Sequence, residues 1–137
     1  MSQPTLSTPT SGFGLTLHVS FTEAVTRVTE ALKTEGFGVL TTIDVQATMK
    51  TKLAVDVAPY TILGACNPTL AHRALTVDPN VGLMLPCNVV VRTTADGIRV
   101  DFADPQALLT IIPNNAMVAV AAEARAKLQR VAATLQA

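Results

Sequence analysis

The feature that most constrains the fold is a turn signal at Ala95-Asp96-Gly97. It lies between VGLMLPCNVVVRTT, residues 81–94, and GIRVDF, residues 97–102. In the second stretch, apolar and polar residues alternate, which is the period of a strand with one buried face. An Asp-Gly step between two such stretches indicates a tight turn joining antiparallel strands. The sequence therefore predicts at least one antiparallel strand pair.

Upstream of this hairpin, strand patterns alternate with helix patterns. We expect three further strands, reading GLTLHVS, FGVLTTI and YTILGAC, over residues 14–20, 37–43 and 60–66. The helices after them should begin at side chains that accept hydrogen bonds from free backbone N–H groups. These expected N-cap residues are Ser20 (with Glu23 in a capping box), Asp44 and Asn67. Gly36 is expected just beyond the end of the first helix.

Apolar residues at helical spacing indicate which helix faces should be buried. In the second helix they are Val45, Met49 and Leu53, and in the third Leu70, Ala71, Ala74 and Leu75. Asp104-Pro105 predicts the start of a short helix over residues 105–111. In the alanine-rich C-terminal segment, the expected buried stripe is Val120, Ala124, Leu128, Val131 and Leu135.

This order of elements predicts an α+β fold with a mainly antiparallel sheet packed by helices and a long C-terminal helix. A parallel α/β sheet is the second choice, because strands and helices alternate in the first half. A chain of 137 residues suits one domain, which we place at residues 13–137. Residues 1–12 are rich in Ser, Thr, Pro and Gly and are expected to form a disordered tail.

Composition narrows the classes of partner. The ten basic and ten acidic residues cancel, so the basic excess that phosphate binding requires is absent and we expect no nucleic-acid partner. No apolar run reaches the roughly 20 residues that span a bilayer, and the N-terminus does not read as a secretory signal. We therefore expect a soluble cytoplasmic protein with reduced thiols. The lack of net charge also leaves self-association unopposed.

Cys66 and Cys87 are the only two cysteines, and an asparagine follows each of them. Cys66 directly precedes Asn67 and Pro68, which we expect to cap and to begin a helix. The N-terminal end of a helix carries partial positive charge and free N–H groups, and both stabilise a thiolate. Cys66 is therefore a candidate reactive or ligating thiol. The apolar run ILGAC that contains it also fits a buried structural cysteine.

Asn88 has no such ready explanation. In a strand over residues 87–93, Cys87 shares a face with Val89, and Asn88 points to the other face. An asparagine within an apolar strand costs free energy unless its amide is paired. Pro86 cannot donate to a strand ladder and marks a strand start, an edge or a bulge. Asn88 therefore lies at a bulge, anchors a loop or lines a pocket.

The two histidines are weaker candidates. His72 falls about one turn into the helix after Pro68, where it could approach Cys66 as a partner for nucleophilic chemistry. Next to a charged neighbour, it also fits an exposed position. A zinc site would need His18, His72 and both cysteines from four separate elements, with no familiar ligand spacing. A soft metal or a cofactor held by one or two of the cysteines stays open.

Several common catalytic patterns are absent. No paired carboxylates share a face, and neither the phosphate-binding glycine motifs nor the serine-hydrolase elbow occurs. Catalytic residues and cofactors stay unknown, and these absences favour a binding protein over an enzyme.

Three stretches carry a family resemblance: GFGV at 36–39, LGACNP at 63–68 with Ala71, and LPCNV at 85–89. Across about residues 13–135 the chain resembles domain-of-unknown-function family 302 (DUF302). That family is similar in fold to TATA-binding-protein-like α+β proteins, with a curved antiparallel sheet packed by helices. The resemblance implies a fold and no activity. It also implies that the two Cys-Asn steps are the family's signature, which favours a pocket at them.

Three hypotheses follow. The first is a binding module that holds a small molecule, an anion or a soft metal between the sheet and the helix that Asn67 caps. Its expected ligand-binding residues are Cys66, Asn67, His72, Cys87 and Asn88. The second is a thiol-dependent redox protein or enzyme, with Cys66 as nucleophile and Cys87 as the resolving thiol. The third is a structural homodimer without chemistry at the cysteines, paired through the hairpin or an edge strand.

Overall fold

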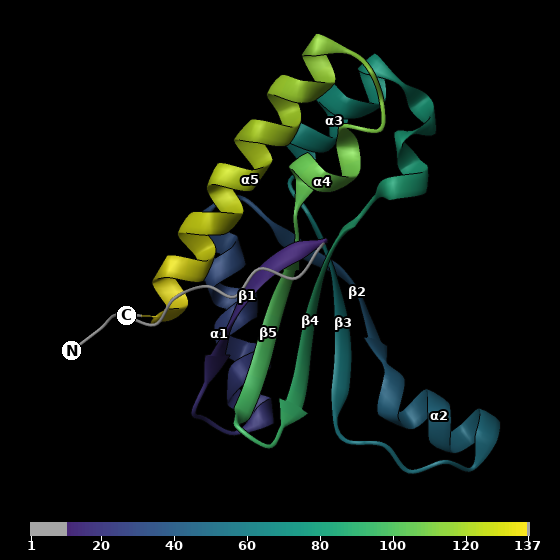
Figure 1. The fold of residues 1–137 in the computed structure, drawn as a ribbon, viewed down its shortest axis with the longest axis vertical. Helices are drawn as coiled ribbons and strands as arrows, with labels where there is room; N and C mark the ends of the chain where they lie inside the picture. Colours follow the sequence, from purple (N-terminus) through teal and green to yellow (C-terminus); the bar gives the residue numbers. More distant parts are fainter. Residues whose placement is uncertain (1–10, 137) are drawn as a thin grey trace.

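The computed structural model describes residues 11–136 and contains a five-stranded sheet (Figure 1). Its strands are β1 (Gly12–Leu17), β2 (Gly38–Asp44), β3 (Tyr60–Cys66), β4 (Cys87–Thr94) and β5 (Gly97–Ala103). They lie in the order β1-β5-β4-β3-β2, and every neighbouring pair is antiparallel. The predicted α+β fold with a mainly antiparallel sheet is confirmed, and the parallel alternative is wrong.

The predicted hairpin joins β4 to β5. Thr94 pairs with Gly97 across a turn formed by Ala95 and Asp96. Gly97 has a φ of 134°, a backbone conformation that side-chain-bearing residues rarely adopt, which explains the glycine. β5 also pairs with β1, and β4 with β3, so the hairpin lies inside the sheet and the two edges are β1 and β2.

The helices begin where their cap residues predict. They are α1 (Phe21–Thr34), α2 (Val45–Leu53), α3 (Pro68–Val77), the 3-10 helix η1 (Pro79–Met84), α4 (Pro105–Leu109) and α5 (Asn115–Gln136). Four of these N-termini have the expected side-chain acceptor, contributed by Ser20, Asp44, Asn67 and Asp104. Gly36 follows the end of α1 with a φ of 83°, as expected of the residue beyond a helix C-terminus.

Buried side chains form two hydrophobic cores. In the first, which we call the sheet core, α1 and the C-terminal part of α5 pack against one face of the sheet, with Val28, Val100 and Leu128 fully buried. In the second, the helical core, α3, η1 and α4 pack against the N-terminal part of α5. The predicted apolar stripe of α5 is buried along its whole length and contributes to both cores.

α2 departs from its sequence pattern. Its period-four apolar residues predict a buried face, yet no residue of α2 is buried, and Leu53 is 65% exposed. The helix stands at one end of β2, away from α1 and α5 (Figure 1). The spacing predicted a helix correctly, but its apolar face is covered only in part, with Val45 and Met49 half-buried and Leu53 exposed.

Two further expectations need correction. The apolar residues 81–84 belong to η1 rather than to a strand, and β4 begins only at Cys87, directly after Pro86. Of the expected N-terminal tail, residues 1–10 lie outside the described part of the chain, whereas Gly12 already pairs with Ala103 in β1. Among residues 11–136, no helix is long and apolar enough to cross a membrane.

Candidate functional site

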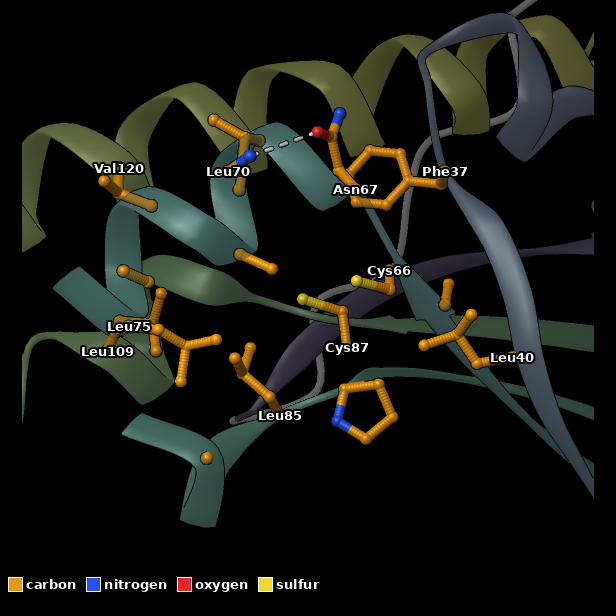
Figure 2. Close-up of a pocket in the computed structure, with 16 residues that line it drawn as sticks. Phe37, Leu40, Cys66, Asn67, Leu70, Leu75, Leu85, Cys87, Leu109 and Val120 are labelled. Carbon is orange, nitrogen blue, oxygen red and sulfur yellow. Dashed lines mark hydrogen bonds between the residues drawn. The ribbon is translucent and has the colours of Figure 1, made fainter. Parts of the chain in front are cut away.

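A cavity of about 330 Å³ lies where the sheet core and the helical core meet (Figure 2). Its walls are formed by the start of β2, the end of β3 and the start of β4, together with the helices α3, η1, α4 and α5. The lining residues are Phe37, Leu40, Ala65, Cys66, Asn67, Leu70, Ala71, Ala74, Leu75, Gly82, Leu85, Pro86, Cys87, Leu109, Val120 and Ala124.

This lining is almost entirely hydrocarbon. Apart from two thiols and the Asn67 amide, every side chain that lines the cavity is apolar, and none is charged. Leu40 and Leu75 are 68% and 43% exposed, so they connect the cavity with the surface. Such a cavity can offer a guest apolar contact and water exclusion, with few directional polar contacts.

The two cysteines meet at this cavity. Cys66 is the last residue of β3, and Cys87 is the first residue of β4, where it pairs with Ala65. Cys66 directly follows Ala65, so the two cysteines are offset by one position in the register of β3 and β4. Both thiols are free and half-buried, and their sulfur atoms point into the same part of the cavity (Figure 2).

Burial changes the acidity of one of these thiols. It raises the pKa of Cys87 from 9.0 to about 11, and the nearby Cys66 contributes to the same rise. Desolvation is the larger cause, because an apolar wall solvates a thiolate poorly. Cys87 is therefore a neutral thiol at physiological pH.

Asn67 connects two helices. Its side-chain oxygen accepts a hydrogen bond from the N–H of Leu70, 3.2 Å away, and its amide nitrogen donates to the carbonyl oxygen of Glu35 at 3.1 Å. Glu35 is the C-terminal cap of α1, so Asn67 fastens the start of α3 to the end of α1. A Cβ atom added to Gly36 would lie 3.0 Å from this amide nitrogen. Close approach of Asn67 therefore favours glycine at this position, in addition to the positive φ.

The other predicted site residues lie elsewhere. Asn88 is exposed, pairs with Gly64 and points to the sheet face opposite Cys87, so it does not line the cavity. Because it meets solvent there, its amide needs no protein partner. His72 is an exposed residue of α3 and does not line the cavity either. His18 lies beside Gly97, at the opposite end of the sheet from Cys66.

No metal cluster of the usual size is assembled by the described residues. Within residues 11–136, no three or more His, Cys, Asp or Glu side chains are placed to hold one ion. The four-ligand zinc arrangement considered from the sequence does not form, because the two histidines are separated from the cysteines.

Sequence reasoning missed most of the cavity wall. Leu40 reaches it because the β2–β3 register shifts between Val39 and Thr41, and no local pattern indicates that shift. Leu109 and Val120 come from α4 and α5, far along the chain from either cysteine. Leu75 was expected on the buried side of α3 and is instead partly exposed, because its side of the helix meets the cavity.

Comparison with known proteins agrees with this description. The model of the family described as "Domain of unknown function DUF302" matches residues 13–135. The chain is also similar to the crystal structure of an uncharacterised conserved DUF302 protein from Bacillus stearothermophilus, with a TM-score of 0.83 and 29% sequence identity. That similarity covers 90% of this chain and 96% of the other. None of the curated proteins matches the chain.

Proposed function

The chain belongs to the DUF302 family, and we propose that it is a binding module for a small, uncharged, largely apolar molecule held in the cavity beside Cys66 and Cys87. One observation carries this proposal: a cavity of about 330 Å³ whose wall is hydrocarbon except for two thiols and one amide. Its volume lies at the lower end of the range typical of ligand pockets, roughly 300 to 1,000 Å³.

The chemistry of the wall selects the kind of guest. Transfer of apolar surface from water contributes about 25 cal/mol per Å² of area, so a snug apolar guest gains affinity without directional bonds. The two thiols add soft, polarisable contacts at one end. The sequence also left an anionic ligand open as an alternative. An anion would bind weakly in this cavity, because no charged side chain lines it and the Asn67 amide already bonds Leu70 and Glu35.

The redox hypothesis ranks below binding for a physical reason. A resolving thiol must attack as a thiolate. The pKa of about 11 for Cys87 leaves only a small fraction of thiolate at neutral pH. Rapid closure of a Cys66–Cys87 disulfide by a mild disulfide oxidant at pH 7 would restore that hypothesis.

Titration with N-phenyl-1-naphthylamine, an uncharged apolar dye that fluoresces when it leaves water, tests the proposal. We expect saturable 1:1 binding to the native protein. Ala71→Phe places a ring in the cavity and should weaken binding at least about tenfold, whereas the control Ala122→Phe changes an exposed residue of α5 and should not. Equal binding by both variants, or none by the native protein, would refute the proposal.

A second candidate role, pairing with a second copy of the chain, rests on a different observation. Exposed apolar side chains gather over β2, α2 and the segment after it, namely Leu40, Ile43, Leu53, Val55 and Val57. β2 is also an edge of the sheet, and such an edge can pair with an identical antiparallel strand. The zero net charge does not oppose such pairing.

Sedimentation equilibrium tests the homodimer. If the β2–α2 region pairs two copies, the native protein has dimer mass, and Leu53→Lys shifts it toward monomer. The control Leu83→Lys alters a leucine of η1 that is 88% exposed and should leave the mass unchanged. Monomer mass for the native protein at high concentration would remove this role.

A further inference from the structure

The cavity contains a pair of sulfur donors as well as an apolar wall. Cys66 and Cys87 come from neighbouring strands, both are free, and both sulfur atoms are directed toward the same region (Figure 2). The influence of Cys66 on the pKa of Cys87 is consistent with this proximity. Two thiols that face one space can bind a single ion together.

The number and type of donors limit which ion fits. Within residues 11–136 no third His, Cys, Asp or Glu joins the pair. Zinc requires about four ligands, and calcium and magnesium require oxygen donors, so neither kind of ion suits the site. Soft thiolates prefer soft d¹⁰ cations, of which Cu(I) accepts two thiolates in a linear arrangement.

The surroundings also suit a two-coordinate ion. The cavity walls that accompany the sulfurs, including Leu85 and Pro86, are hydrocarbon and supply no charged or oxygen-bearing side chain other than the Asn67 amide, which already bonds Leu70 and Glu35. Two thiolates and one monovalent cation leave a single negative charge. α3 begins at Pro68, directly after Cys66 and the cap residue Asn67, and the positive end of its helix dipole favours that charge.

We propose that Cys66 and Cys87 form a two-coordinate binding site for Cu(I). Each sulfur donates one electron pair to the metal, and each thiol releases its proton to solvent: Cu⁺ plus two thiols gives the bis-thiolate complex, with charge −1, and two H⁺. The copper stays in the Cu(I) state, so the step needs no oxidant or reductant. Because two protons leave, the apparent affinity rises with pH.

Anaerobic titration of the fully reduced protein with Cu(I), against the chelator bathocuproine disulfonate, tests this site. We expect one Cu(I) per chain, with sulfur-to-copper charge-transfer absorption. Cys66→Ser and Cys87→Ser should each raise the dissociation constant about 100-fold or more, because either change halves the donor set. Ser20→Ala, which removes only the α1 cap, is the control and should leave Cu(I) affinity unchanged.

X-ray absorption at the copper edge identifies the atoms bound to copper directly. The site predicts two sulfur neighbours and no nitrogen or oxygen neighbour. Native-like affinity in both cysteine variants, no binding by the native protein, or a nitrogen-containing copper shell would overturn the proposal.

This inference goes beyond the proposed apolar-ligand function, and the two fail separately. The cysteine-to-serine variants keep the hydrocarbon walls, so they should still bind N-phenyl-1-naphthylamine within about threefold of the native protein. Dye binding without Cu(I) binding would remove only the metal site. Cu(I) binding without dye binding would remove only the apolar-ligand function.

Discussion

At the scale of single residues, the two Cys-Asn steps turn out to have different roles. Asn67 is 9% exposed and bonds both the start of α3 and the end of α1. Asn88 is exposed on the other face of the sheet and bounds no cavity. The shared sequence pattern therefore brings two thiols to one cavity, while only one of the two asparagines is structurally required.

Replacing Asn67 should destabilise the protein. Asn67→Ala removes the α3 cap and leaves the Glu35 carbonyl oxygen without this donor, so the free energy of unfolding should fall by about 1 to 3 kcal/mol. Asn88→Ala is the matched control and should change it by less than about 0.5 kcal/mol. Urea denaturation of both variants measures the difference, and equal losses would contradict the roles assigned here.

Cys87 should make stability depend on pH in the alkaline range. Its pKa is about 11 in the folded protein against an ordinary value of 9.0, so the native state holds the thiol proton more tightly than the unfolded chain. This contribution is fully present below pH 9 and is lost as the pH rises through 11.

Denaturation of the native protein and of Cys87→Ala across this pH range measures that contribution. Between pH 9 and pH 11 the native protein should lose about 2 kcal/mol more stability than the variant. The comparison cancels the contributions of the other ionisable groups, which both proteins share. Parallel curves would show that the folded protein does not shift the Cys87 pKa.

At the scale of elements, α5 and α2 behave in opposite ways. α5 buries one face against both cores, with Met117 in the helical core and Leu128 in the sheet core. α2 buries no residue, and its links to the rest include an ion pair from Lys50 to Asp56 and a hydrogen bond from Gln46 to the carbonyl oxygen of Val57. Both of these links lie on the surface and contribute little.

Hydrogen exchange should reveal this difference. Amides of α2 should be protected about 100-fold less than those around Leu128, because α2 can open locally while α5 exchanges only when the cores unfold. Mass spectrometry of peptides from the two helices measures both in one sample. Equal protection in dilute solution would contradict the account, whereas protection of α2 that grows with protein concentration would support the homodimer.

The elements also show what could be predicted from the sequence. Ser20, Asp44 and Asn67 act on their own helix ends, so local sequence was sufficient to place these starts. Burial of Leu53 depends on what lies opposite it, and the period-four pattern carries no information about that. The apolar run at 81–84 was expected in a strand but forms η1, because a short apolar run fits either a strand or a helix and periodicity alone does not distinguish them.

At the scale of the whole molecule, the cavity exists because two cores meet without filling the space between them. α5 runs through both cores, and Val120 and Ala124 line the cavity from its N-terminal half. The cysteines could be singled out from the sequence, because they stand next to predicted element ends. Their shared wall could not, because it depends on how α3, α4 and α5 pack against the sheet.

The most direct test of the central claim locates a small apolar guest in this molecule. Methyl NMR spectra with toluene should show intermolecular nuclear Overhauser effects to cavity methyl groups, namely those of Leu70, Leu75, Leu85 and Val120. They should show none to Leu53 and Val55, which are exposed near α2. Effects confined to the α2 region, or no effects at all, would contradict a binding site between the two cores.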